Sequence, residues 1–428
     1  MRVLVVGGGG REHALLWALK RDGTAKTLFA APGNPGTALL GTNLPIPTAN
    51  VDGLVSAAKD QKIDVVIVGP EAPLAAGLAD RLRKDGRAVF GPGARGARIE
   101  ASKAYAKDLM VKAGVPTAKS GTFTSLKPAL KYIEAGREPV VVKASGLAGG
   151  KGAIVCATKD DATQAAEALL EGGALGEAGR EIVIEEFLEG EELSVLALTD
   201  GEHIVILPPA QDHKRVREGD EGPNTGGMGA YTPVGITTPT LLARVRQEVL
   251  DPTLKALAKD GAPYSGVLYA GLMVAPDGTP NVIEFNCRFG DPETQALFPV
   301  LPKGSTSHLT AIASGKWQPD RDVIDPVAAA VTTVLAAPGY PESPRLGETI
   351  RLPKEWPEDQ ILFHAGTTQD QSGALKVSGG RVLNVTGLGP NIARAAEASR
   401  AGAGLVSFAG MHWRRDIAWR EIARAGAA

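Results

Sequence analysis

The sequence predicts a multidomain protein of the α/β and α+β classes. Over residues 1–92, short apolar strand patterns alternate with helical patterns, which is typical of a doubly wound parallel sheet with helices on both faces. The run Gly91-Pro92-Gly93 then breaks this alternation, and the units that follow show mainly strand patterns. The length of 428 residues corresponds to about three domains of ordinary size.

The first unit combines four expected strands with three expected helices. The strand patterns lie at Arg2–Val6, Lys26–Ala30, Asp64–Val68 and Ala88–Phe90, and the helical patterns at Glu12–Lys20, Val51–Lys59 and Leu74–Lys84. Because these strands are short, apolar and bounded by turn residues, they suit a sheet that is buried on both faces. A ligand site is expected at the carboxyl ends of such strands.

The remaining chain is expected to form three further units. A helix should run from Ser102 to Ala113, because Gly114-Val115-Pro116 ends it. The later strand patterns lie at Val140–Lys143, Ala153–Cys156, Ile182–Phe187, Leu193–Thr199, His203–Pro208, Gly266–Ala275, Asn281–Cys287, Ala328–Ala336 and Arg381–Thr386, and a last helical pattern at Ile392–Ala401. The patterns indicate a smaller unit over 120–188, a larger one after it, and a C-terminal unit over 327–428.

Composition and charge exclude several classes of function. The chain has 46 basic and 48 acidic residues, a net charge of −2, whereas a protein that coats nucleic acid or anionic membrane needs a basic excess. Cys156 and Cys287 cannot form a disulfide framework, and no Cys/His group has zinc spacing. No stretch of 18 apolar residues and no signal-peptide core is present. We therefore expect a soluble cytoplasmic protein without nucleic-acid or membrane partners.

The first glycine cluster, residues 7–10, follows a strand and precedes a helix. This context suits a phosphate, because glycine lets the backbone approach and helix N–H groups meet the anion. The dinucleotide-binding fingerprint fails, however, since its third glycine would fall at Glu12 or His13 and no acid ends the second strand. A phosphorylated small ligand at this edge is favoured, with a plain tight turn as the alternative.

A second glycine-rich segment starts at the strand that ends in Lys143 and continues through the loop 145–152. An ammonium group and backbone amides there could bind a polyphosphate. The segment is not a P-loop, because Ser145 stands where glycine is required and Gly152 where Ser or Thr is required. A β-hairpin with a solvated lysine explains the segment equally well.

Polar and charged residues stand at every second position of the strand pattern near residue 284. Glu284, Asn286 and Arg288 should share one face of the strand. A carboxylate and an amide oxygen two residues apart can share a magnesium ion, and the arginine can hold a carboxylate or a transferring phosphoryl group. The alternative is a charged solvent face, although the ending Arg-Phe-Gly-Asp-Pro-Glu is unusual for one.

Two segments between these clusters are less specific. The acidic run 185–192 by itself predicts a solvated face. The glycine-rich stretch 222–231 follows the charged segment 211–215, and a loop of this length inside a compact domain is usually functional or mobile.

Taken together, ten segments resemble the phosphoribosylamine–glycine ligase family of the ATP-grasp superfamily over essentially the full length. They are 7–14, 32–36, 69–74, Ser102-Lys103, Lys143 with its loop, 185–192, 211–215, 222–231, 284–293 and 378–383. The resemblance implies a Rossmann-like N-terminal domain over 1–100, a central ATP-grasp main lobe over 101–119 and 189–326 with a lid subdomain over 120–188, and a small C-terminal α+β domain over 327–428.

The resemblance also implies a reaction. ATP phosphorylates the carboxylate of glycine to an acyl phosphate, and the amine of 5-phosphoribosylamine displaces phosphate, giving glycinamide ribonucleotide and ADP. ATP is then a co-substrate, Mg²⁺ or Mn²⁺ the cofactor, and a monomer the expected state. A carboxylate is a poor electrophile, so phosphorylation supplies its leaving group, and that transfer requires fixed cations.

Residue roles follow from the resemblance, position by position. The implied ATP-binding residues are Lys103, Lys143, Gly146, Gly149, Gly150, Lys151, Gly152, Glu185, Glu186, Phe187, Leu188 and Glu192. The implied substrate-binding residues are Gly9, Gly10, Asn34, Glu71, Asp212, Lys214, Asn224, Thr225, Gly226, Gly227, Arg288 and Arg381. Glu284 and Asn286 are the implied metal ligands, and Arg288, Lys143 and Asp212 the implied catalytic residues.

Two departures from the family pattern bear on these roles. The strand 266–275 carries no second acid, so a metal would depend on Glu284, Asn286 and phosphate oxygens. The loop reads Ala-Gly-Gly-Lys rather than Ala-Ala-Gly-Lys, and the extra glycine predicts a mobile segment over 145–152 without nucleotide. The alternatives are another ATP-grasp ligase or carboxylase, and a nucleotide-responsive binding protein without turnover.

Overall fold

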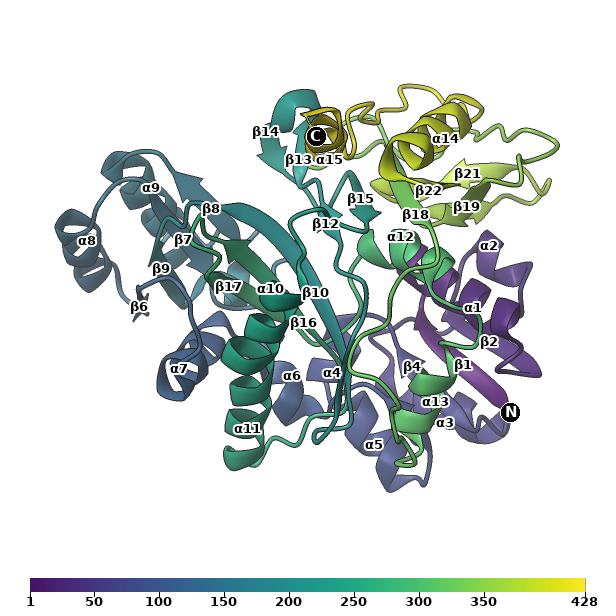
Figure 1. Ribbon diagram of the computed structural model, residues 1–428, viewed down its shortest axis with the longest axis horizontal. Coiled ribbons are helices and arrows are strands. Elements are labelled where there is room, and N and C mark those ends of the chain that lie inside the picture. Colours follow the sequence, from purple (N-terminus) through teal and green to yellow (C-terminus); the bar gives the residue numbers. More distant parts are fainter. Residues whose placement is uncertain (428) are drawn as a thin grey trace.

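The computed structural model, whose described residues are 1–427, is built around four sheets of four or five strands (Figure 1). A parallel N-terminal sheet is followed by antiparallel sheets with helices, which confirms the expected fold class. Within the described part of the chain, no helix is long and apolar enough to cross a membrane.

The N-terminal sheet has the strand order β3-β2-β1-β4-β5. Its strands are β1 (Arg2–Gly7), β2 (Thr27–Pro32), β3 (Thr42–Asn43), β4 (Val65–Val68) and β5 (Ala88–Phe90). Its helices are α1 (Gly10–Asp22), α2 (Pro35–Ala38), α3 (Val51–Asp60), α4 (Glu71–Ala75), α5 (Leu78–Lys84) and α6 (Ala94–Ala101). Gly7 pairs with Pro32 in the parallel register, so the glycine runs after β1 and β2 lie at the same carboxyl edge.

One expectation for this unit is wrong, and the helix α6 was not expected. The pattern over 74–84 is not one helix, because Gly77 adopts a left-handed conformation (φ 82°) between α4 and α5. The break at 91–93 is real, but α6 begins directly after Gly93. Gly96 inside α6 weakens its helical signal, which explains why the sequence did not predict it.

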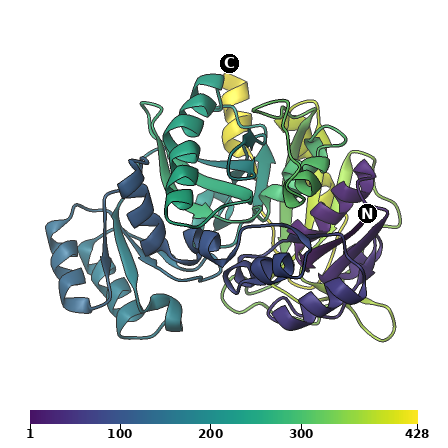
Figure 2. The same cartoon turned by 90° about the horizontal axis from the view of Figure 1, so that it is seen from below.

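Residues 120–188 form an antiparallel sheet of their own, in the order β6-β9-β7-β8. The elements are β6 (Ser120–Phe123), α8 (Leu126–Ala135), β7 (Val140–Ala144), β8 (Ala153–Cys156), α9 (Lys159–Leu170), η1 (Gly176–Gly179) and β9 (Ile182–Glu186). Side chains such as Ile133, Val142 and Ile184 form a separate core beneath the two helices. Figure 2 shows this unit, in blue, at one end of the molecule and the purple N-terminal strands at the other.

The central sheet has the antiparallel order β11-β10-β16-β17. The elements are α7 (Lys103–Ala113), β10 (Glu191–Thr199), β11 (Ile204–Ile206), α10 (Pro239–Arg244), the π-helix η3 (Val245–Leu250), α11 (Asp251–Lys259), β16 (Gly266–Val274), β17 (Pro280–Asn286), α12 (Glu293–Val300) and α13 (Ser307–Ala313). The helix expected over 102–113 is confirmed, with the Ser102 hydroxyl accepting the Tyr105 N–H as an N-cap.

The C-terminal sheet has the order β12-β15-β18-β22-β19, and its first two strands come from the middle of the chain. The elements are β12 (Gln211–Asp212), β13 (Arg215–Arg217), η2 (Glu218–Asp220), β14 (Glu221–Asn224), β15 (Gly229–Thr232), β18 (Ala329–Ala336), β19 (Gln360–His364), β20 (Thr367–Gln369), β21 (Leu375–Val377), β22 (Arg381–Gly389), α14 (Ile392–Gly404) and α15 (Trp419–Ala427). Because β15 pairs with β18, the segment 211–232 is fixed to the C-terminal part of the protein.

Candidate active site

Lys143, at the end of β7, lies against the middle of β17. Its Nζ donates a hydrogen bond to the Ile283 carbonyl (3.0 Å) and pairs with the Glu185 carboxylate on β9 (2.9 Å). Ile283 is the extra residue of a bulge in the β16–β17 ladder, which leaves its carbonyl free of the ladder. The β7–β8 hairpin is present, but Lys143 is only 3 % exposed, so the alternative of a solvated lysine is wrong.

Glu185 connects Lys143 to a second buried lysine that the sequence analysis missed. Lys107, on α7, has its Nζ 3.2 Å from Glu185 Oε1 and donates to the Thr117 hydroxyl (2.6 Å). Burial lowers the pKa of Lys107, and the charge of Glu185 opposes that shift. The hydroxyl of Thr117 in turn donates to the Val282 carbonyl on β17 (2.7 Å). This network ties α7, β9 and β17 together directly behind Lys143.

The acidic run 185–192 is therefore not a plain solvated face. Glu185 is buried, whereas Phe187 is 40 % exposed and Glu186 accepts a hydrogen bond from the Lys119 N–H (3.0 Å). Only part of the expectation for this run is correct.

The loop 145–152 between β7 and β8 lies beside the other candidate residues. Lys103 Nζ is 3.5 Å from the Gly146 carbonyl. A Cβ placed on Gly150 would lie 3.5 Å from the Thr225 carbonyl oxygen. The two glycine-rich loops, one expected at ATP and one at substrate, thus approach each other closely.

Glu284 and Asn286 lie on β17, next to three lysines. Burial alone would raise the pKa of Glu284, but Lys214, Lys103 and Lys143 outweigh it and hold that pKa below its ordinary value. Over residues 1–427, neither side chain makes a hydrogen bond or ion pair, and no three His, Cys, Asp or Glu residues cluster as a metal site. Two free oxygen ligands, completed by phosphate and water, fit Mg²⁺.

Arg288 follows β17 and is held by two carboxylates. Its Nη2 donates to Glu100 Oε1 (2.7 Å) and its Nε to Glu71 Oε2 (3.3 Å). Burial would lower the pKa of Arg288, but Glu100 and Glu71 raise it. The sequence analysis missed Glu100, at the end of α6, which also accepts the Cys287 N–H (2.7 Å).

Asp212, Lys214 and Glu192 form a charged group beside Glu284. Lys214 Nζ pairs with Glu192 Oε2 at 2.6 Å. Burial raises the pKa of Asp212 to about 7; Lys214 acts against this shift, and Glu293 adds to it. Glu293, at the start of α12, accepts the Tyr269 hydroxyl (2.5 Å) and was not predicted as a site residue.

The loop 224–227 is held from both sides. Thr225 donates to the Lys214 carbonyl through its N–H and its hydroxyl (2.8 Å each), and Asn224 pairs with Arg215 in the β13–β14 hairpin. Arg381, expected to contact substrate, donates through Nη1 to the carbonyls of Gly226 and Asp291 (2.5 and 2.6 Å). It fastens the loop that includes Gly227 to the start of α12.

A cavity of about 460 Å³ opens between the N-terminal glycine runs and the C-terminal sheet. Its lining includes the expected Gly9 and Asn34, and polar residues that were not expected: Arg11, Glu12, Thr48, Asp291, Thr367 and Ser378. Gly10 does not line it, since a Cβ there would collide with Asn384 and Gln295 (2.5 Å each). Asn34 shapes the wall by donating to the carbonyls of Gly8 and His364 (2.9 Å each).

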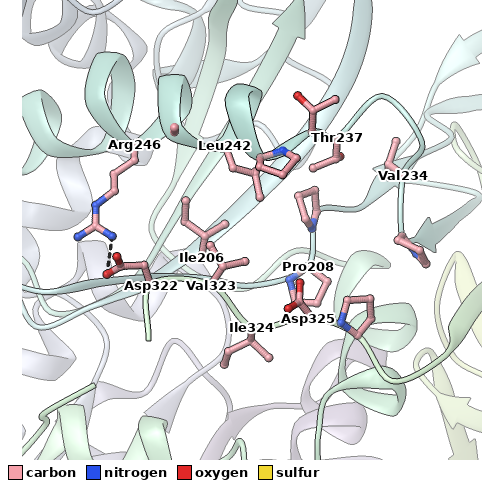
Figure 3. Close-up of a pocket in the computed structure, with 16 residues that line it drawn as sticks. Ile206, Pro208, Val234, Thr237, Leu242, Arg246, Asp322, Val323, Ile324 and Asp325 are labelled. Atoms are coloured by element: carbon pink, nitrogen blue, oxygen red, sulfur yellow. Dashed lines mark ion pairs between the residues drawn. The ribbon is translucent and has the colours of Figure 1, made fainter. Parts of the chain in front are cut away.

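A second cavity, of about 430 Å³, contains none of the expected residues. Figure 3 shows its apolar walls, with Ile206, Leu242 and Ile324 among them, and the Arg246–Asp322 ion pair (2.8 Å) on one side. The candidate chemistry therefore belongs to the groups around Lys143, Glu284 and Asp212.

Two antiparallel sheets that converge on a buried lysine and a Glu–Asn pair define an ATP-grasp protein. Family models of phosphoribosylglycinamide synthetase match nearly the whole chain: its N domain over residues 1–100, its ATP-grasp (A) domain over 101–294 and its C domain over 330–420. The chain belongs to this family, and the resemblance seen in the motif order is confirmed.

Relatives of known name agree with this assignment. The chain is 45% identical to a phosphoribosylamine–glycine ligase from Vibrio parahaemolyticus, over 99% of both chains, and 47% identical to one from Nostoc, over 98% of this chain and 99% of the relative. The crystal structure of the Thermotoga maritima phosphoribosylamine–glycine ligase is similar, with a TM-score of 0.87, 35% identity, and 97% and 100% of the two chains covered. A biotin carboxylase domain from Hydrogenobacter thermophilus shares only the fold, at 17% identity and a TM-score of 0.74 over 96% and 91% of the chains.

Proposed function

We propose that this protein joins glycine to 5-phosphoribosylamine with ATP, giving glycinamide ribonucleotide, ADP and phosphate in purine biosynthesis. The observation that carries the proposal is the meeting of three groups at one place. Lys143 and Lys103, suited to phosphate, and Lys214, next to Asp212, all act on the carboxylate of Glu284. The residues suited to bind the phosphates of ATP and those suited to bind the acid and amine substrates therefore lie around the same carboxylate.

The first step proposed is attack of a glycine carboxylate oxygen on the γ-phosphorus of ATP. The P–O bond to ADP breaks, and glycyl phosphate forms. Lys103, Lys143 and the loop 146–152 offset the charge of the triphosphate, with Arg288 beside the carboxylate. Glu284 and Asn286 would hold Mg²⁺ or Mn²⁺, which supplies further positive charge at the phosphate oxygens.

The second step proposed is attack of the phosphoribosylamine nitrogen on the glycyl carbonyl. The C–N bond forms, phosphate leaves, and the nitrogen loses a proton. Asp212 is suited to take that proton, because a carboxyl with a pKa of about 7 is partly ionised at neutral pH. Lys214 can stabilise the ionised form.

The remaining expected contacts are assigned as part of the same proposal. The chain at Glu186–Leu188 would bind the adenine edge, and Glu192 the ribose, in exchange for its ion pair with Lys214. The 460 Å³ cavity would hold phosphoribosylamine, supported by the hydroxyls of Thr48, Thr367 and Ser378 in its lining. Residues 120–188 would act as a lid, supported by their separate core.

We also propose a cytoplasmic monomer that acts on small molecules alone. Support for a reducing compartment is that both cysteines, Cys156 and Cys287, are free and buried. Sedimentation of the purified chain tests the monomer.

ADP release tests the proposed function. The chain is assayed with Mg²⁺, ATP and glycine, with and without phosphoribosylamine generated in situ. We expect release only when both substrates are present, together with glycinamide ribonucleotide. Nucleotide binding without turnover would support the alternative of a binding protein, and turnover with a different acid or amine would support another ATP-grasp ligase.

A further inference from the structure

The tip of the β13–β14 hairpin is held by a C-terminal strap, defined as residues 412–420. Arg414, which is fully buried (0 % exposed), lies at the centre of this contact. Its Nη1 donates to Asp220 Oδ1 (2.9 Å) and to the Arg215 carbonyl (3.0 Å), and its Nε and Nη2 donate to the two carboxylate oxygens of Asp416 (2.8 and 2.7 Å). A planar guanidinium makes these four bonds together, which the ammonium of lysine cannot do.

Other groups of the strap converge on the same hairpin. Arg420 Nη2 and Trp419 Nε1 both donate to Asp220 Oδ2 (2.6 and 3.1 Å). The Arg415 N–H donates to Glu218 in the turn (3.0 Å), and the His412 ring donates to the Val216 carbonyl (2.7 Å). Asp220 thus accepts hydrogen bonds from three side chains of the strap, more than a solvated turn requires.

Backbone strain lies on both sides of this contact. Asp220 and Ala418 have positive φ values of 56° and 69°, and among the non-glycine residues described only Lys62 shares that property. Such conformations are unfavourable for residues with a Cβ and persist where surrounding contacts enforce them. The strained Ala418 presents its N–H to His213 Nε2 (2.9 Å). Two of three strained residues therefore serve one contact.

The base of the hairpin carries the residues proposed to bind substrate. His213, which bonds the strap, lies between Asp212 and Lys214 in the sequence, and its carbonyl accepts the Met228 N–H (2.7 Å). Thr225 is bonded to the Lys214 carbonyl on the opposite strand. A shift of the hairpin would therefore move both sides of the substrate segment at once.

We propose that Arg414 is a positioning residue that acts through Asp220: it holds the β13–β14 hairpin so that Asp212, Lys214 and the loop 224–227 face the acid and amine substrates. The inference rests on the proposed function and deepens it. The hydrogen bonds and ion pairs of the strap include none of the residues expected at ATP. The strap therefore acts on the substrate side of the site.

The test is a double-mutant cycle of Arg414→Met and Asp220→Asn in the full chain, with Arg414→Lys as the conservative variant. Each single variant should lower kcat/KM for glycine about tenfold, and the double variant no more than the worse single one, because both remove the same contact. Arg414→Lys should not rescue the loss. The KM for ATP should rise by a smaller factor than kcat/KM for glycine falls, because the strap bonds none of the residues expected at ATP directly and reaches Glu192 only through Lys214.

A matched control is Arg244→Lys, which alters an arginine that donates to the Gly278 carbonyl in the turn before β17 (2.7 Å) and to Glu248 one helical turn further along its own helix (2.7 Å). It should leave kcat/KM for glycine unchanged. Losses that multiply in the double variant to about a hundredfold, or an equal rise in the KM for ATP, would overturn the proposal. If Arg414→Met does not fold, Asp220→Asn alone decides: hydrogen exchange over 213–227 should accelerate, and unchanged exchange overturns it. A wild-type chain that forms no glycinamide ribonucleotide would instead refute the proposed function.

Discussion

At the scale of single residues, Glu284 has an ionised carboxylate with free oxygens at the meeting point of three lysines. Replacing Glu284 with Ala should leave the fold intact and lower turnover by a factor of about 100 or more, because charge stabilisation during phosphoryl transfer is lost. Steady-state kinetics at saturating Mg²⁺ measures this effect, with Glu189→Ala at an exposed position of the same lobe as control. A kcat near that of wild type would remove Glu284 from the metal site.

A substitution at Arg288 tests a different property, the planar geometry of the guanidinium group. Its two arms bond Glu100 and Glu71, and a lysine in its place keeps the charge but can satisfy only one direction at a time. Arg288→Lys should therefore be severely impaired in kcat, whereas Arg394→Lys, an exposed pair with Glu397, should not. An unchanged rate for Arg288→Lys would place the arginine outside the chemistry.

As the proposed base, Asp212 should make the reaction pH-dependent in a defined direction. With a folded pKa of about 7 and an ordinary value of 3.8, its carboxyl keeps a proton between these values that the unfolded chain has lost. This group alone therefore makes stability fall as pH rises from about 4 to about 7. Activity should rise over the same pH range, because the base ionises there. Asp212→Asn should lower kcat and flatten the dependence of kcat on pH. A wild-type profile that is flat from pH 5 to 8 would contradict the role of Asp212 as a base.

Some residues of the site could not be predicted one by one. Glu100 and Lys107 stand in stretches of ordinary helical composition, and only the fold brings Glu100 to Arg288, 188 positions further along the chain. Arg381 stays predicted at the substrate, and its hydrogen bonds to the carbonyls of Gly226 and Asp291, which the sequence did not predict, also fasten the 224–227 loop. The place of Glu284 and Asn286 on one strand could be predicted, because the strand pattern is local, whereas their role as metal ligands stays a prediction.

At the scale of elements, four of the five strands of the N-terminal sheet and the strands of the central sheet were predictable from apolar runs between turn residues, whereas the two-residue strand β3 was not. The helices α8 and α9 were not predicted, and neither were the pairing of β12 with β15 and that of β15 with β18. A two-residue strand such as β12 has no periodicity to recognise, so its place depends on its tertiary partner β15. The helix expected over 74–84 failed for a local reason, the left-handed Gly77.

The loop 145–152 carries the prediction made at this scale. Its consecutive glycines, Gly149 and Gly150, favour mobility without nucleotide, and ATP should order it by contact with the phosphates. Hydrogen exchange over 145–152 should therefore slow when ATP and Mg²⁺ are added, while exchange over α14 stays the same. Equal protection of the loop with and without ATP would contradict its closing over the triphosphate.

At the scale of the whole molecule, three separate regions supply the site. The 120–188 unit provides Lys143, the central sheet provides Glu284 and Asn286, and the C-terminal sheet holds the segment with Asp212 and Lys214. Cooperation among these regions explains why the motif order along the full chain was more informative than any single motif. The most direct test therefore follows the complete proposed reaction. In that reaction one oxygen of the glycine carboxylate is transferred to the released phosphate.

That measurement uses glycine labelled with ¹⁸O in its carboxylate. The chain is incubated with labelled glycine, ATP, Mg²⁺ and phosphoribosylamine, and the inorganic phosphate is analysed by mass. If glycyl phosphate forms and the amine displaces phosphate from it, each product phosphate carries one ¹⁸O from glycine. Formation of glycinamide ribonucleotide with unlabelled phosphate would contradict an acyl phosphate at this site.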